Sequence, residues 1–189
     1  MTKTIEILRE EHRSIEKLLL VLEQELEIFE RRERPDYEIL QAVINYFQDY
    51  PDRCHHPKED MIFAKLKARD PVAAEVIGDL ESDHQQEAKR LRGLAQAVGS
   101  ILTDHDLPRQ AFGKVVRDFV GNQRRHMSME ERVLFPAAAK ALRPEDWAGI
   151  DAQLNDQRDP LPDKAIEERF KLRREQILAW EQDNRSAAI

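Results

Sequence analysis

Four long segments of this chain place apolar residues alternately three and four positions apart. They run over roughly residues 4–33, 36–68 and 72–102, and from the polar turn at 103–108 to Ala137. This alternation puts the apolar side chains on one stripe of an α-helix, and it is the spacing of helices that pack side by side in a left-handed bundle. The pattern predicts four long amphipathic helices joined by short turns.

The expected fold is therefore all-α, an up-down-up-down four-helix bundle with an additional C-terminal helix. Residues 1–143 are expected to form the bundle domain, and residues 144–189 a linker followed by a helix that packs on it. Residues 144–162 are rich in Pro and Asp, which favours the linker, and 163–183 are amphipathic. That last stretch carries Ile166, Phe170, Ile177 and Trp180.

Composition agrees with long helices and argues against several classes of protein. Glycine is scarce, with 6 of 189 residues, and charged residues make up 35% of the chain. No run approaches the roughly 18 apolar residues of a membrane span, and the N-terminal stretch does not resemble a signal peptide. The net charge of −7 and the mixing of Lys and Arg with acids argue against nucleic acid as a partner. The single cysteine, Cys54, fits a reducing compartment, so we expect a cytoplasmic protein with no membrane partner.

Histidine and glutamate interrupt the apolar stripes. A stripe takes about two of every seven helical positions, so chance would place roughly two of the six histidines there. Four fall on it, and glutamates accompany them, although burying a carboxylate is unfavourable unless it is paired or bound to a cation. The candidate metal ligands are His12, His55, Glu59, His84, His126 and Glu130.

The spacing of these residues repeats. Glu59 follows His55 by four residues, as Glu130 follows His126, and residues four apart lie on one helix face about one turn from each other. An imidazole nitrogen and a carboxylate oxygen can then reach the same cation. His12 precedes the first pair and His84 the second, so the two halves present the same order, which indicates a pseudo-twofold site.

A mixed set of imidazoles and carboxylates favours iron, with manganese or zinc as alternatives, whereas calcium and magnesium prefer oxygen alone. Six protein ligands are more than one catalytic zinc uses. Two irons bridged by Glu59 and Glu130 explain the number of ligands best.

The stretch "CHHPKEDMIF" at 54–63 leaves part of the ligand set open. His56 shares a helix face with Asp49 and Asp60, which is polar, so His56 and Asp60 are expected at the edge of the site or behind it. Pro57 removes a helical hydrogen bond and kinks the chain, and such a kink would be able to turn His56 inwards. Glu87, one turn from His84, is a further candidate for an oxygen ligand or an outer hydrogen-bond partner.

The motifs "EEH" at 10–12, "HHPKED" at 55–60, "DH" at 83–84 and "HMSMEERVLFP" at 126–136 resemble the hemerythrin-like (HHE cation-binding) family over roughly residues 4–143. The resemblance implies a four-helix bundle with a non-haem di-iron centre that meets oxygen, or that senses or stores iron. Carried over by position, it implies the same six ligands. Oxygen-carrying hemerythrins have a further histidine where this chain has Ala88, and this difference weakens the case for reversible oxygen carriage.

Three functions remain open on the sequence. The first is a non-haem di-iron protein that binds or senses oxygen, a related small molecule or iron, with a diatomic molecule or peroxide as its partner. The alternative is a di-iron oxidoreductase, ferroxidase- or peroxidase-like, that uses the same site. The third is a helical interaction protein without metal, and measured metal content separates it from the other two.

Overall fold

The computed structural model describes residues 2–78, 80–102, 108–155 and 164–187, and within these ranges all regular structure is helical. The all-α bundle expected from the sequence is confirmed. Two of the elements, η1 and η2, are single π-helical turns. The elements are α1 (Lys3–Glu30), α2 (Tyr37–Tyr50), η1 (Pro51–His55), α3 (His56–Arg69), α4 (Pro71–Ile77), α5 (Leu80–Leu102), α6 (Arg109–Met129), η2 (Glu130–Leu134), α7 (Phe135–Ala141), α8 (Pro144–Asn155) and α9 (Lys164–Ala187).

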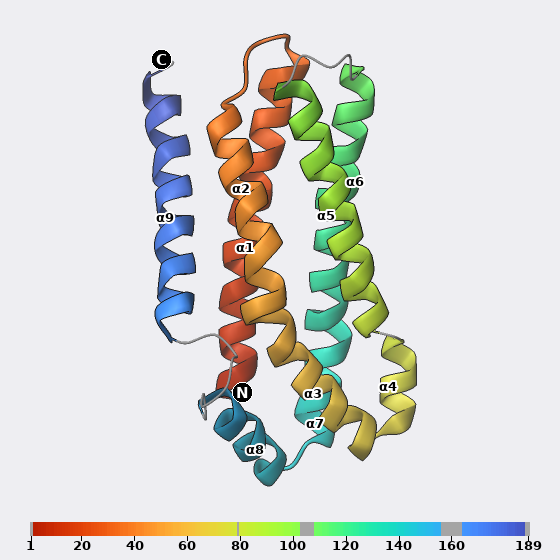
Figure 1. Ribbon diagram of the computed structural model, residues 1–189. Helices are drawn as coiled ribbons and strands as arrows, with labels where there is room; N and C mark the ends of the chain where they lie inside the picture. Colours follow the sequence, from red (N-terminus) through yellow and green to blue (C-terminus); the bar gives the residue numbers. More distant parts are fainter. Residues whose placement is uncertain (1, 79, 103–107, 156–163, 188–189) are drawn as a thin grey trace.

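Four long rods make up the body of the molecule (Figure 1). Helices α1, α2, α5 and α6 lie side by side, with α6 packed on α1 and α5, and α2 packed on α5 and α1. Helix α3 continues α2, and α7 continues α6, towards the end of the bundle where the N-terminus lies. No helix in the described ranges is long and apolar enough to cross a membrane.

Local signals set two of the helix ends. Asp36 caps α2, because its side chain accepts hydrogen bonds from the backbone N–H groups of Glu38 and Ile39 at 2.9 and 3.1 Å. The helix expected over 72–102 is interrupted after Ile77, where Gly78 has a φ of +86°. Glycine tolerates this left-handed conformation, which ends α4 and lets α5 begin in a new direction.

Both helical segments that carry a His-x-x-x-Glu pair contain one π-helical turn, and each turn is followed closely by a proline. Pro57 has no N–H to donate to the carbonyl of the residue four positions earlier, and neither has Pro136. The helix widens here, because each N–H bonds to the carbonyl five residues earlier. The N–H of His56 donates to the carbonyl of Pro51, and the N–H of Phe135 donates to that of Glu130. A π turn inserts one extra residue, so every side chain after it is turned relative to a regular α-helix.

A polar layer divides the core into two apolar clusters. The larger cluster fills the bundle from Ile15 and Cys54 towards the 31–36 turn, and the smaller one lies around Leu8, Ile62 and Leu134 at the opposite end. Each of the four rods runs from one cluster to the other, and each crosses the polar layer at the same height along the bundle. Along α1, for example, Leu8 belongs to the smaller cluster and Ile15 to the larger, and His12 lies between them.

The segment expected to be a linker contains helix α8. Trp147 and Ile150 are buried in the smaller apolar cluster, and the Asp146 carboxylate accepts two hydrogen bonds from the Arg69 guanidinium at 2.8 and 2.9 Å. These contacts join α8 to α3. The remainder of that segment, 156–162, lies outside the described residues.

Helix α9 runs alongside α2 and α1 (Figure 1). Phe170 and Ile177, seven residues apart, are 7% and 2% exposed and bind it to the larger cluster. Trp180, which the sequence placed on the same apolar face, is 48% exposed, because the stripe in contact with the bundle is narrow. The side chain of Ile166 lies outside the described part of the chain.

Candidate metal centre

The six candidate ligands come together in the polar layer of the bundle. Helix α1 supplies His12, the α2–α3 rod supplies His55 and Glu59, α5 supplies His84, and the α6–α7 rod supplies His126 and Glu130. The two glutamates are 0% exposed, and each of the four histidine side chains is at most 8% exposed.

In each of these four histidines, Nε2 faces the two glutamates. The Nε2 of His55 lies 3.1 Å from Glu59 Oε1, and that of His126 lies 3.0 Å from Glu130 Oε1. The Nε2 of His12 lies 3.4 Å from Glu59 Oε1 and 3.3 Å from Glu130 Oε2. His84 contributes Nε2 at 3.5 Å from Glu59 Oε2 and 4.0 Å from Glu130 Oε1.

Each glutamate directs one carboxylate oxygen towards His12 and the other towards His84. Glu59 turns Oε1 to His12 and His55, and Oε2 to His84. Glu130 turns Oε2 to His12, and Oε1 to His126 and His84. This is the arrangement that a carboxylate needs to bridge two cations.

Two groups of potential ligands result, one on each side of the glutamates. One consists of His12, His55, Glu59 and Glu130, and the other of His56, Glu59, His84 and His126, with the ligand atoms of each group within 4.8 Å of one another. A cation bound at about 2.0–2.2 Å holds its ligand atoms roughly 3–4 Å apart. The separations of 3.0–4.0 Å between the inward atoms match that range.

The inward atoms lie close together, but among the described residues none of them forms a hydrogen bond of good geometry. Both oxygens of Glu59 and both of Glu130 are buried without one. The same holds for Nε2 of His12, His84 and His126. Buried polar atoms without a partner are rare in folded proteins, because leaving one unpaired costs about 1–3 kcal/mol. A cation at the focus of these atoms would satisfy them, so the residues fit a metal.

His56 belongs to the site, contrary to the position at its edge or behind it that was expected. His56 is 7% exposed, and its ring stacks on the ring of His84 with the centroids 3.8 Å apart. A regular helix would put His56 on the polar face with Asp60. The extra residue of η1 turns the chain, so His55 and His56 both face the interior.

The Nδ1 atoms of the five histidines face outwards to a second set of carboxylates. The Nδ1–H groups of His12, His55 and His56 donate to Glu131, Glu11 and Asp52 at 3.0, 2.8 and 3.1 Å. A carboxylate oxygen of Asp60 lies 3.3 Å from Nδ1 of His84, and one of Glu87 lies 3.7 Å from Nδ1 of His126. An outer carboxylate of this kind fixes the tautomer of a metal-ligating histidine and orients its ring. Asp60 is half exposed and acts from outside the site.

Glu87 lies at the border of the second group. It is 5% exposed, its Oε2 accepts a hydrogen bond from the Gln123 amide at 3.3 Å, and the same oxygen lies 3.5 Å from Nε2 of His56. Within the described part of the chain, its Oε1 is buried without a hydrogen-bond partner. Glu87 is therefore a potential third carboxylate ligand as well as a partner of His126.

Without a metal, the histidines and glutamates shift one another's protonation. Burial lowers the pKa of His12, but the carboxylates of Glu130 and Glu59 beside its Nε2 outweigh burial and raise that pKa to about 9. At His55, the carboxylates of Glu59 and Glu11 likewise outweigh burial, and they raise the pKa of this histidine to about 10. Burial would raise the pKa of Glu59, and the surrounding histidines instead hold it well below its usual value.

The sequence indicated the inner residues better than the outer ones. Glu11 and Glu131 each adjoin a stripe residue in the chain, so neither occupies a stripe position itself. Their part in the site depends on contacts between rods: Glu11 in α1 binds His55 in η1, and Glu131 in η2 binds His12 in α1. No pattern within one segment indicates such a contact.

Fold and site together define a helical bundle protein with a buried histidine–carboxylate site for cations. A family model described as "Hemerythrin HHE cation binding domain" matches residues 3–138, and the chain belongs to this family. The search of curated proteins and the search of solved structures gave no match.

Proposed function

We propose that this chain is a non-haem di-iron protein that binds or senses oxygen, a related small molecule or iron itself. The observation that carries the proposal is the placement of Glu59 and Glu130, each with one oxygen towards either group of histidines. One cation would use only half of these atoms. Two cations would use all of them.

The donor set supports iron at both positions. Imidazole nitrogen combined with carboxylate oxygen suits iron, and also manganese or zinc, while the lack of thiolate among the inward atoms argues against a structural zinc site. Bound iron would supply redox chemistry with oxygen species. The chain itself holds the imidazoles in one tautomer through the outer carboxylates and excludes water with the apolar clusters above and below.

The test is metal analysis of the chain after anaerobic reconstitution with ferrous iron. We expect about two irons per chain and near-ultraviolet charge-transfer absorption on exposure to air. Glu59→Gln keeps the shape of the side chain, removes the charge shared by both groups, and should abolish the paired site. The exposed Glu10→Gln is the matched control. A native chain that retains no metal would refute the proposal.

A di-iron oxidoreductase, ferroxidase- or peroxidase-like, is the second candidate, and Glu87 favours it. Glu87 is buried and lies 3.5 Å from Nε2 of His56 and 3.7 Å from Nδ1 of His126, so it adds a carboxylate at the border of the second group. Turnover of peroxide or ferrous iron above the rate of free iron would support this candidate. A rate no higher than that of free iron would leave binding or sensing.

We also propose that residues 1–143 form the metal-binding domain and 144–189 an accessory segment. The single cysteine, Cys54, is buried, and it is compatible with a reducing cytoplasm as the place of action. The partner we propose is a small diatomic molecule or peroxide, with neither nucleic acid nor membrane involved.

A further inference from the structure

A groove on the outside of the bundle lies between helix α9 and the α2–η1 segment. Its volume is about 380 Å³, within the range of about 300–1,000 Å³ that is usual for pockets that bind small molecules. Its two walls come from segments that are distant in the chain and pack together in the fold. Among the lining residues are Asp49, Arg53, Arg169, Phe170, Leu172 and Arg173.

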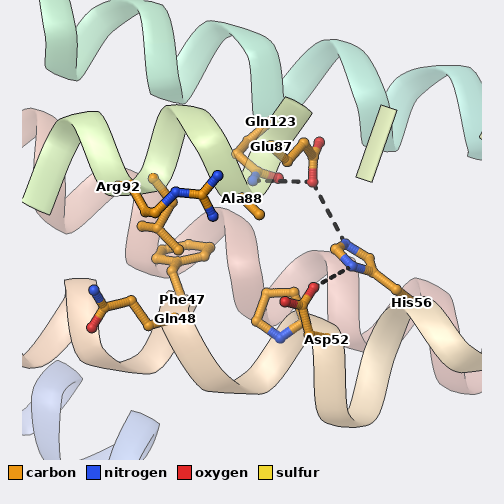
Figure 2. Close-up of a pocket in the computed structure, with 10 residues that line it drawn as sticks. Phe47, Gln48, Asp52, His56, Glu87, Ala88, Arg92 and Gln123 are labelled. Atoms are coloured by element: carbon orange, nitrogen blue, oxygen red, sulfur yellow. Dashed lines mark hydrogen bonds and ion pairs between the residues drawn. The ribbon is translucent and has the colours of Figure 1, made fainter. Parts of the chain in front are cut away.

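The groove is separate from the metal centre. Figure 2 shows the side of the same rod that faces α5, where Asp52 and His56 line a small cavity beside Ala88. That cavity adjoins the second ligand group and belongs to the site described above. Arg53 follows Asp52 in η1 but lines the groove at α9, and no residue lines both spaces.

Positive charge dominates the groove. Three arginines and one acid line it, although the chain as a whole has a net charge of −7. The Arg53 guanidinium lies as far as 3.9 Å from the Asp49 carboxylate, and Arg173 forms no ion pair within the described part of the chain. The donors of both guanidinium groups are therefore open to a ligand.

This arrangement of charges suits a phosphate group. A guanidinium is a planar fork of donors that binds phosphate oxygens in pairs, and Arg53 and Arg173 approach the groove from opposite walls. The negative net charge of the chain repels anions at long range. An anion held here is therefore held by the local cluster of arginines.

The apolar part of the groove indicates a ligand larger than free phosphate. Phe170 is 7% exposed and closes the groove towards the core, whereas Leu172 is 57% exposed beside the arginines. An apolar body attached to the phosphate would cover Leu172. Removing about 40 Å² of apolar surface from water strengthens binding about fivefold.

We propose that this groove is a binding site for a soluble phosphomonoester with a small apolar or aromatic body, and that the ligand fastens α9 to the α2–η1 segment. Arg53 and Arg173 bind the phosphate oxygens, and Leu172 contacts the body. The site goes beyond the proposed di-iron function and does not depend on it.

Binding is tested by calorimetric titration of the full chain with phenyl phosphate, once metal-free and once loaded with iron. We expect a Kd of about 1 mM or tighter, equal in both preparations. Arg53→Gln and Arg173→Gln should each weaken binding at least fivefold, because each removes charge-assisted hydrogen bonds. Lys171→Gln removes the same charge from an exposed position of α9 outside the groove lining, and should change the affinity less than twofold.

Three outcomes of this titration would overturn the site. Equal effects of the three variants would show a general charge effect. Binding confined to the iron-loaded chain would place the phosphate on the metal. A native chain that binds no phenyl phosphate at about 10 mM would exclude the groove as a phosphomonoester site.

Inorganic phosphate distinguishes the free anion from an organic phosphate. We expect it to bind about fivefold more weakly than phenyl phosphate to the native chain, and Leu172→Ser should remove this preference. Leu20→Ser, at a 44% exposed position of α1 outside the groove lining, should keep it. A native chain that binds both anions equally well would overturn the assignment of an organic ligand.

Amide exchange tests whether the ligand fastens α9. A ligand that contacts both walls must dissociate before α9 can open, so phenyl phosphate at ten times its Kd should slow exchange in α9 about 10-fold. Arg53→Gln, which leaves α9 itself unchanged, should abolish the slowing at the same concentration. Exchange in α9 that is unaffected by bound phenyl phosphate would overturn the fastening.

Discussion

The rings of His56 and His84 are stacked, with centroids 3.8 Å apart and planes inclined by 7°. The two residues come from different rods, α3 and α5, and both belong to the second ligand group. His126 meets the ring of His84 nearly edge-on at 5.1 Å, so three imidazoles close this side of the centre. The stack depends on the π turn that brings His56 inwards.

Replacement of His56 should affect one cation position and spare the other. In His56→Ala we expect the second cation to bind at least 10-fold more weakly, because His56 is a potential ligand in that group only. His12→Ala should weaken the first position instead. Metal titration followed by calorimetry resolves the two positions. Equal loss from both positions in His56→Ala would contradict the assignment of His56 to one group.

The outer carboxylates should tune affinity without binding metal. Glu11 accepts a hydrogen bond from Nδ1 of His55 at 2.8 Å and another from Lys58 at 2.7 Å. Glu11→Gln keeps the shape and loses the charge, so we expect metal affinity to fall about 10-fold with the number of bound metals unchanged. Its neighbour Glu10, whose side chain is 67% exposed, provides the control Glu10→Gln. Competition with a coloured chelator measures both variants, and equal affinities would exclude an orienting role for Glu11.

The metal-free protein should be most stable in mildly acidic solution. The pKa of His12 is raised from 6.5 to about 9 in the folded chain, so its contribution is complete below pH 6.5 and is lost as the pH rises through 9. For His12 alone this loss is on the order of 3 kcal/mol. Glu130, whose pKa is lowered from 4.5 to about 2, contributes above pH 4.5 and loses its effect as the pH falls.

Urea unfolding of chelator-treated protein between pH 4 and pH 10 measures this profile. We expect a maximum between about pH 4.5 and 6.5 and a decline towards pH 9. With metal bound the decline above pH 6.5 should disappear, because a cation needs the deprotonated Nε2 that high pH supplies. If the free energy of unfolding of the metal-free protein rises between pH 6.5 and 9, that result contradicts the pairing of His12 with the glutamates.

The packing of helix α9 should depend on one aromatic residue, Phe170. Phe170 meets Tyr46 and Tyr50 with ring centroids 5.8 and 5.4 Å apart. Phe170→Ala should lower stability by about 3 kcal/mol and raise the rate of amide exchange in α9 first, since this helix lies outside the four rods. Trp180→Ala, at a position 48% exposed, is the control and should cost less than about 1 kcal/mol. Amide exchange that stays unchanged in Phe170→Ala would exclude the anchoring role.

Sequence reasoning predicted well those features that a single helix encodes. The alternation of three and four predicted the rods and the all-α fold, because a helix that buries one stripe must carry it at that period. The same period put His12, His84 and His126 inside, and the spacing of four placed Glu59 beside His55 and Glu130 beside His126. These residues do meet in the polar layer. Helix α8 was expected to be a linker because Pro and Asp are common there, yet Pro144 begins a helix, where its missing N–H has no helical partner to lose.

Only the tertiary structure decided what depends on contacts between rods or on a departure from regular helix. His56 lies inside because η1 adds one residue to the turn, and no regular period contains that residue. The outer partners Glu11 and Glu131, the two-sided placement of the Glu59 and Glu130 oxygens, and the cavity beside Ala88 all join segments distant in the chain. Periodicity reports which side of a helix is buried, and the packing of neighbouring helices fixes which atoms meet there.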